Sequence, residues 1–268
     1  MASGYSATRR LHERALRLLA PARRSAVILA ALALLGFAAI QPPVARGAVE
    51  LYAAGSLGTL EMADVNDRVA AGNRQCAGME WNLMVAGIPA ECSPAPALGV
   101  GLMGEAGVAV SAGGRAGIIA GYQLLGGSTE WTLESSMGGS TSSYGQSYTA
   151  SAQGPVVKAF IGLPGPQLSA RLFAGVGQYR ATYKEQSQMK GRVDDPDAIW
   201  YSETYLGRAP GYEVGLELRS GLGPQAVLTA TVGYGWLRVP KTAADDGDPG
   251  PELDFGGLRL RGGLGLSF

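Results

Sequence analysis

From about residue 48 onward, apolar side chains recur at every second position, with polar residues or glycines between them. This period of two is typical of β-strands with one apolar face, because successive side chains of a strand point to opposite sides. The clearest example is Tyr212–Leu222. Eight segments carry the pattern and are predicted to be strands: Val49–Leu57, Leu98–Ala112, Arg115–Leu125, Gln146–Leu163, Gln167–Tyr183, Tyr212–Leu222, Ala226–Val239 and Leu253–Phe268.

The links between these strands alternate between short and long. The short links, rich in glycine, proline and serine, are typical of turns: Ser111–Gly114, Pro164–Gln167 and Gly221–Gln225. The long links are polar and comprise residues 58–97, 126–145, 184–211 and 240–252. Antiparallel strands that run up and down reproduce this alternation, with the tight turns and both chain termini at one side.

The apolar rows also bear on the environment of the sheet. After residue 47 the chain has no second long apolar run, so a membrane span would have to be built from strands. In hydrocarbon every backbone N–H and C=O needs a partner within the protein, and closing the sheet removes both unpaired edges. We therefore predict an all-β fold, an eight-stranded antiparallel up-and-down transmembrane β-barrel whose apolar rows face lipid. A soluble lipocalin-like barrel, with its apolar rows inside, is the alternative.

The opposite rows carry ionisable side chains that would point into a narrow lumen, where glycines make room for them. Unpartnered buried charge is strongly disfavoured, so these acids and bases are expected to pair and to plug the lumen. They are Glu50, Glu105, Glu213, Glu217, Arg115, Lys158, Arg171, Arg219, Arg259 and Arg261. Leu98 is predicted to lie on the lipid-facing row of Leu98–Ala112. Ile119 breaks the alternation in Arg115–Leu125.

The first 47 residues differ in composition from the remainder. A basic stretch to Arg24 precedes the apolar run Ala26–Ile40, and Pro42-Pro43 follows, which is the order of a secretory signal peptide. The apolar run is shorter than the roughly 20 residues of a transmembrane helix. We predict a signal peptide over residues 1–47 and one barrel domain over 48–268. Removing seven arginines and one glutamate leaves 15 basic and 21 acidic side chains, which argues against nucleic acid as a partner.

The chain has two cysteines, Cys76 and Cys92, both after the predicted signal peptide. An even pair in an exported chain indicates a disulfide that closes a loop, worth about 3 kcal/mol by loop-closure arithmetic. A zinc site is not expected, because the only histidine, His12, belongs to the predicted signal peptide.

The last strand ends in the letters GLRLRGGLGLSF, with an aromatic residue at the final position. In this ending and in its charged inward rows, the chain resembles the small outer-membrane barrels typified by the OmpA transmembrane domain and OmpX. The resemblance covers roughly residues 48–268, in pattern rather than in detailed sequence. It implies the outer membrane of a Gram-negative cell, a monomer, membrane lipid and lipopolysaccharide as partners, and recognition by the barrel-assembly machinery through Leu264, Leu266 and Phe268.

Aromatic residues near the long links are expected to form an interfacial girdle, as in such barrels. They are Tyr122, Tyr148, Tyr179, Tyr183, Tyr212, Tyr234 and Trp236. Within the first long link, Thr59–Asn73 is predicted to be a short helix capped by Thr59, with Met62, Val65 and Val69 on one stripe. This helix either covers the barrel mouth or packs on its rim, and we favour the rim.

Three functions are weighed. A structural or surface-binding barrel without enzymatic activity is favoured, and a small or gated pore is the alternative. A lipid A-modifying enzyme is less favoured, because the known reactions of this kind use a histidine. The only histidine, His12, would be removed with the signal peptide. No catalytic residue, cofactor or metal site is predicted. The acidic runs Asp194–Asp197 and Asp245–Asp248 lack the spacing of a calcium loop and are interpreted as solvated loop charge.

Overall fold

The computed structural model describes residues 48–112, 115–163, 168–190, 198–244 and 246–268, so the predicted signal peptide over residues 1–47 lies outside the described part. The elements in chain order are β1 (Ala48–Thr59), α2 (Ala63–Val85), β2 (Ala90–Ser93), β3 (Val100–Ala112), β4 (Ala116–Met137), β5 (Ser140–Leu163), β6 (Leu168–Lys190), β7 (Ala198–Gly221), β8 (Ala226–Val239), β9 (Leu253–Asp254) and β10 (Gly257–Ser267).

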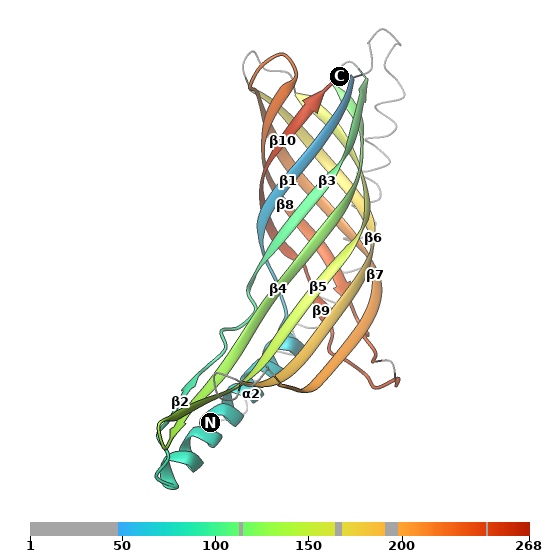
Figure 1. The fold of residues 1–268 in the computed structure, drawn as a ribbon. Coiled ribbons are helices and arrows are strands. Elements are labelled where there is room, and N and C mark those ends of the chain that lie inside the picture. Colours follow the sequence, from blue (N-terminus) through green and yellow to red (C-terminus); the bar gives the residue numbers. More distant parts are fainter. Residues whose placement is uncertain (1–47, 113–114, 164–167, 191–197, 245) are drawn as a thin grey trace, which may run out of the picture.

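Eight of these strands close into a ring. Strands β3 to β8 pair in chain order, each antiparallel to the next. Strand β1 pairs with β3 on one side and with β10 on the other, and β10 pairs in turn with β8. Figure 1 shows the resulting barrel, with the C-terminus at the end of the short turns. The predicted eight-stranded antiparallel up-and-down barrel is confirmed.

The side chains on the two faces of the barrel wall differ in the predicted sense. Leu260 on β10 is 55% exposed on the outer surface, whereas the adjacent Arg259 is 2% exposed in the lumen. The exposed row continues around the wall in Leu51, Val108, Ile118, Val157, Leu172, Leu218, Val232 and Leu264. Because the apolar rows point outward, the lipocalin-like arrangement is wrong for this chain. The band of apolar side chains around the outer wall is called the belt below.

Two of the predicted long links are largely strand. Strand β4 continues past Leu125 to Met137, and β5 begins at Ser140, so residues 126–145 form a long hairpin rather than a loop. Its turn is Gly138-Gly139, both at positive φ, a conformation that glycine adopts without strain. Likewise β6 reaches Lys190 and β7 starts at Ala198, so most of 184–211 is paired strand.

The period of two persists through these hairpins, but the polarity of the two faces reverses. On β4 the outward residues change from Ile118 and Tyr122 to Glu130 and Glu134, while the inward row acquires Trp131, which is fully buried. A segment with a polar outer face reads as a loop when only lipid-facing strands are sought, which explains the error.

The predicted last strand, Leu253–Phe268, is also interrupted. Phe255 and Gly256 separate β9 from β10, and Gly257, the first residue of β10, has φ 137°. A Cβ at Gly257 would overlap the side chain of Thr59, so the close approach to β1 requires glycine.

Helix α2 is longer than predicted and begins later. It spans 63–85 rather than 59–73, its N-cap is Met62, and Thr59 is the last residue of β1. The Thr59 hydroxyl accepts a hydrogen bond from the Leu258 N–H instead of capping the helix (2.9 Å). Within the described residues, no helix combines the length and the apolar character needed to cross a bilayer.

Candidate functional site

The centre of the lumen holds a cluster of buried ion pairs around Glu105 and Glu213. The Lys158 ammonium lies 2.6 Å from Glu105 and 3.6 Å from Glu213. The Arg261 guanidinium lies 2.8 Å from Glu105 and also contacts Glu213, while Arg259 lies 3.3 Å from Glu213. These side chains are 2–7% exposed and come from β3, β5, β7 and β10, so the pairs connect opposite walls of the barrel.

A second ionic layer lies nearer the short turns. Arg171 is 3.5 Å from both Glu50 and Glu217, and Arg219 contacts Glu50 and lies 3.3 Å from Glu217. The aromatic rings of Phe160 and Phe173 separate the two layers, since Arg171 stacks on Phe160 at 4.2 Å and Lys158 on Phe173 at 5.0 Å. Ile119 packs with these rings, so the residue that broke the alternation is part of an apolar layer inside the lumen.

Nine of the ten predicted lumen charges take part in these layers. The exception is Arg115, which lies exposed in the turn before β4, where its carbonyl accepts a hydrogen bond from Gly162. Arg115 falls outside the strand because β4 starts at Ala116, so the alternation does not fix its direction. Its placement in the lumen is wrong.

Three uncharged polar side chains complete the central cluster and were missed. The Gln123 amide donates to Glu105 and Glu213 at 2.7 and 2.9 Å. Tyr179 donates to the Gln123 carbonyl oxygen (2.5 Å), and Tyr52 donates to Glu105 (2.6 Å). Their strand parity already indicated the lumen, because Tyr52 follows Glu50 by two residues and Tyr179 has the parity of Arg171.

The layers leave little free space inside the barrel. A cavity between them has a volume of about 20 Å³ and is lined by Glu50, Tyr52, Glu105, Lys158, Arg171 and Arg261 among others. A cavity of this size holds about one water molecule. The described part of the lumen is therefore filled by side chains rather than by a continuous water column.

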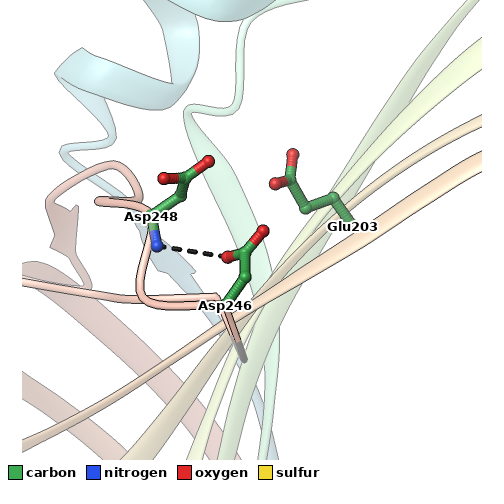
Figure 2. A group of neighbouring side chains, drawn as sticks. All are labelled: Glu203, Asp246 and Asp248. Carbon is green, nitrogen blue, oxygen red and sulfur yellow. Dashed lines mark hydrogen bonds between the residues drawn. The ribbon is translucent and has the colours of Figure 1, made fainter.

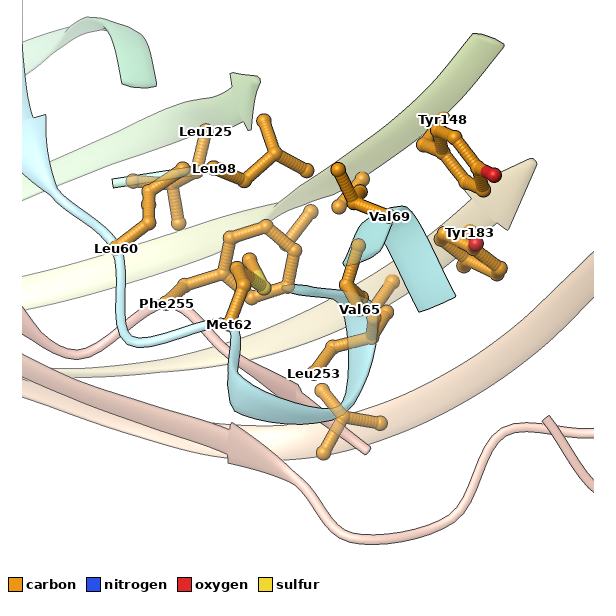
Figure 3. Close-up of a cluster of buried hydrophobic side chains, with 14 of the residues drawn as sticks. Leu60, Met62, Val65, Val69, Leu98, Leu125, Tyr148, Tyr183, Leu253 and Phe255 are labelled. Atoms are coloured by element: carbon orange, nitrogen blue, oxygen red, sulfur yellow. The ribbon is translucent and has the colours of Figure 1, made fainter. Parts of the chain in front are cut away.

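The barrel mouth at the other end is packed with apolar side chains. Met62, Val65 and Val69 of the predicted stripe are buried there, which confirms the stripe and places the first half of α2 inside the mouth rather than on its rim. Figure 3 shows Val65 and Val69 directed toward residues contributed by the strands. The core they join includes Leu60, Leu98, Leu125, Tyr148, Tyr183, Leu253 and Phe255.

Four residues predicted to face lipid or the membrane interface belong to this mouth core instead. Leu98 lies before β3 starts and is 3% exposed, so it does not continue the lipid-facing row. Tyr148, Tyr179 and Tyr183 are also buried inside the barrel. The remaining girdle residues, Tyr122, Tyr212, Tyr234 and Trp236, lie on the outward row, where Tyr212 and Trp236 are register partners and the rings of Tyr234 and Trp236 are 4.8 Å apart.

One ion pair lies within this mouth core, beyond the belt. Arg68 of α2 lies 3.3 Å from Glu185 and 5.5–5.8 Å from the ring centres of Tyr183 and Tyr205. Burial opposes the charge of Arg68, but Tyr205, Tyr183 and Glu185 outweigh it and raise the arginine pKa. Burial, followed by the Glu185 charge, raises the pKa of the Tyr183 hydroxyl. Arg68 thus stays charged, and its ion pair with Glu185 fastens the helix to β6.

The second half of α2 is part of a long projection that we call the arm. The arm consists of residues 70–97 and the outer parts of β4 and β5, residues 127–152 (Figure 1). Cys76 and Cys92 form the predicted disulfide, with their Cα atoms 5.9 Å apart. Strand β2, which contains Cys92, pairs with β4 from Ser93↔Thr132 to Ala90↔Ser135.

Two asparagines hold the chain that returns from the arm. The Asn73 side chain donates to the Ala95 carbonyl (2.9 Å) and accepts from the Ala95 N–H (2.8 Å). Asn66 makes the same pair of bonds with Leu98, at 3.2 and 2.7 Å. These bonds supply backbone partners to residues that lie outside any strand, so the arm is a defined structure and not a loose loop.

An acidic cluster lies beside the mouth. Carboxylate oxygens of Glu203, Asp246 and Asp248 lie within 4.8 Å of one another, and the Asp248 N–H donates to Asp246 (3.1 Å), as Figure 2 shows. Hydrogen bonds from Tyr201 and Tyr205 lower the pKa of Glu203, so it stays charged. Three carboxylates, of which only Asp246 and Asp248 are exposed, are fewer than the six to eight oxygens that calcium takes. We therefore keep the interpretation as solvated charge; Asp194–Asp197 lie outside the described residues.

No family model matches the chain, and no curated protein matches its sequence. Among solved structures, Ail, the attachment invasion locus protein of Yersinia pestis, is similar at 12% identity, with 83% of this chain and 99% of that chain covered and a TM-score of 0.34. Neisserial surface protein A (NspA) is similar at 11% identity, with 83% and 97% covered and a TM-score of 0.35. A major outer membrane protein from Thermus thermophilus is similar at 11% identity, with 82% and 99% covered and a TM-score of 0.39.

Likenesses this remote carry no argument about activity or about structural detail. The predicted resemblance to eight-stranded outer-membrane barrels is confirmed for the fold, because the strand register of this chain itself closes such a barrel.

Proposed function

We propose that this chain is an integral outer-membrane barrel with a closed lumen, which anchors the arm and presents it outside the cell. The observation that carries the proposal is the filled interior: the two ionic layers and the mouth core leave a central cavity of about 20 Å³. The apolar belt supports a membrane location, because it matches the outward band of transmembrane barrels. Export by residues 1–47 is part of the same proposal.

Planar-bilayer recording separates this anchor from a pore. The purified barrel is expected to give no steady openings, because the lumen is plugged. The double variant Arg259→Ser/Glu213→Ser removes two of the largest fully buried side chains without changing net charge, and serves as a control that should conduct. A shift in gel mobility on heating checks that each protein is folded. Steady openings from the unaltered chain would establish the alternative, a small or gated pore.

The exposed surface of the arm supports a binding role. Near its tip, Trp81, Met84, Val85 and Met137 are 48–70% exposed, although they lie outside the belt. Large exposed apolar groups outside a lipid-facing band mark interaction surfaces. An epitope inserted between Gly138 and Gly139 should be detected by antibody on intact cells. Detection only after the outer membrane is permeabilised would contradict the orientation.

A structural or binding role without catalysis is part of the proposal. The sole histidine lies within residues 1–47, so the chain after that point has no histidine to act as the base of known barrel lipid chemistry. Lipid A extracted from cells with and without this chain should have the same mass spectrum. A new acylated or deacylated species would show an enzyme.

The last strand is proposed to guide assembly. Leu264 and Leu266 are exposed on the outer wall of β10, the strand that closes the ring against β1, and Phe268 is exposed just after it. Deleting Phe268 should lower the amount of heat-modifiable barrel in the outer membrane, whereas Gly262→Leu on the same face should not. A monomer is expected on gels that preserve the fold.

A further inference from the structure

A groove of about 680 Å³ lies on the outer wall, across β1, β3, β4 and β5, where the belt meets the arm. Ligand-binding pockets have volumes of about 300–1,000 Å³, so the groove is large enough for part of a ligand. Its lining comprises Leu57, residues 100–104, residues 124–128 and residues 149–153.

Glycines form the floor of the groove. Strand register places Leu57, Leu102, Gly126 and Ser151 side by side in one row, and Gly104, Leu124 and Gln153 in the adjacent row. A Cβ at Gly104 would meet nothing within 4 Å, so this position is open to the outside. The leucines stand beside these gaps and form apolar walls.

The chemistry of the lining changes from one end to the other. On β1 and β3 it is apolar, and Leu57, Val100 and Leu102 are each more than half exposed. On β4 and β5 it becomes polar but uncharged, through Ser128, Thr149, Ser151 and Gln153. None of the described residues that line the groove is ionisable.

Exposed cations stand next to the polar end. Gln153 is the register partner of Arg180, which in turn pairs with Arg208, and Thr149 pairs with Lys184. All three cations are exposed on the outward face, and within the described residues none of them forms an ion pair. Neighbouring strands are about 4.8 Å apart, so Arg180 lies about one strand spacing from the groove.

We propose that this surface binds the lipid A part of lipopolysaccharide, with one acyl chain in the groove and a phosphate on Arg180, Arg208 and Lys184. Arginine matches phosphate in geometry and charge, while the apolar walls continue the belt that acyl chains cover. The source is lipopolysaccharide because the site lies at the arm end of the belt, the outer leaflet under the proposed orientation. The assignment therefore depends on the proposed location, but binding to purified protein does not.

Binding of bisphosphorylated lipid A to the purified barrel in detergent can be measured by native mass spectrometry. Arg180→Gln/Arg208→Gln should weaken binding by about 25-fold, since each basic group near an anionic lipid surface contributes a factor of about five. Gly104→Leu fills the groove and should weaken lipid A binding by about tenfold. This corresponds to the loss of about two buried methylene groups of the acyl chain. Ser151→Leu fills the same groove from its polar end, in case Gly104→Leu fails to fold.

Two controls make the same kinds of change, added volume and lost positive charge, elsewhere on the protein. Gly262→Leu adds the same side chain at another open outward position of the belt, and Arg74→Gln removes an exposed cation of α2. Both should bind lipid A as the unaltered chain does. Dephosphorylated lipid A should bind more weakly and should not respond to Arg180→Gln/Arg208→Gln.

Each other outcome overturns a distinct part of the proposal. Equal binding by the unaltered chain and all variants would exclude this site. Equal affinity for phosphatidylglycerol would mean that the site binds any anionic lipid and is not selective for lipopolysaccharide. The chain could also fractionate away from the outer membrane and still bind lipid A in a way that the variants weaken. That result would overturn the proposed function but not the binding site.

Discussion

The belt region and the mouth with its arm are built from the same strands but with opposite polarity. Within the belt, β4 directs Ile118 and Tyr122 outward and Gln123 inward; beyond it, Glu130 points outward and Trp131 inward. The difference follows the solvent. Where lipid surrounds the wall, charges are accommodated only in the lumen, and where water surrounds it, the apolar side chains occupy the interior.

The two interiors are therefore held by different forces. The lumen depends on charges that satisfy one another, so loss of one partner leaves the others buried and unpaired. The mouth depends on packing of apolar and aromatic side chains around α2, so loss of shape is the sensitive change.

Removing the central acid of the lumen should have the largest effect. Glu213→Ala leaves Lys158, Arg259 and Arg261 without this carboxylate, and should lower the free energy of unfolding by about 3–5 kcal/mol. Urea unfolding in lipid vesicles, followed by gel mobility, measures the change. Glu130→Ala, at an exposed position of the arm, is the control and should change little; equal effects of the two variants would contradict the contrast.

The reversal of polarity along one strand can be tested with the same substitution on both sides of the boundary. Ala120→Lys puts a charge on the outward face within the belt and should cost about 2–4 kcal/mol if that face meets hydrocarbon. Ser136→Lys is on the same face of β4 in the arm and should be close to neutral. The measurement is again urea unfolding in vesicles. A neutral Ala120→Lys would mean that the belt does not face lipid.

The disulfide should matter for the arm and not for the barrel. Cys76→Ser/Cys92→Ser removes a cross-link worth about 3 kcal/mol and should make the 70–97 segment sensitive to protease. The heat-dependent gel shift, which reports the barrel, should persist. Loss of the gel shift would show that the arm and the barrel unfold as one unit.

Packing of α2 on the arm depends on a glycine. A Cβ at Gly72 would lie 2.1 Å from the Tyr148 hydroxyl and 2.6 Å from Trp131 Nε1, so Gly72→Ala should lower arm stability by about 1–3 kcal/mol. Gly78→Ala meets nothing within 4 Å and should stabilise the same helix by about 0.5–1 kcal/mol. Protease protection of the arm distinguishes them, and protection of both variants would mean that α2 does not pack closely here.

The stability of the segment around Asp254 should depend weakly on pH. Burial raises the pKa of Asp254 above its ordinary value, and Glu61 adds to this, although the Gly256 N–H opposes it. The folded state then holds this proton more tightly than the unfolded state. The protonated Asp254 therefore contributes fully to stability at low pH, and this contribution is lost as the pH rises through the folded pKa. Asp254→Asn stays neutral and retains an acceptor for Gly256.

At neutral pH, hydrogen exchange around β9 should therefore be slower in Asp254→Asn than in the unaltered chain, and the difference should vanish in acid. Asp248→Asn, in the exposed acidic cluster, is the matched control. Faster exchange in Asp254→Asn at neutral pH would show that the carboxylate stabilises the segment instead.

Much of the barrel was predictable because lipid imposes a simple rule on each strand. The outward rows and nine of the ten lumen charges followed from parity alone, since every second side chain in a lipid-facing strand must be apolar. Arg115 was misplaced because parity has no meaning in a turn. The helix stripe of Met62, Val65 and Val69 was likewise visible, but its place in the mouth was not.

The amino-acid sequence was enough to predict the strand periodicity, the outward direction of the apolar rows, nine of the ten lumen charges and the cysteine pair, because these depend on local alternation or on residue count. The three-dimensional fold was needed to find where the apolar belt ends on each strand, and therefore which polar segments continue as strands. It also decided which acid meets which base, and how Leu57, Gly126 and Ser151 come side by side with Arg180 one row away. These features depend on register between strands distant in the chain, which no local pattern encodes.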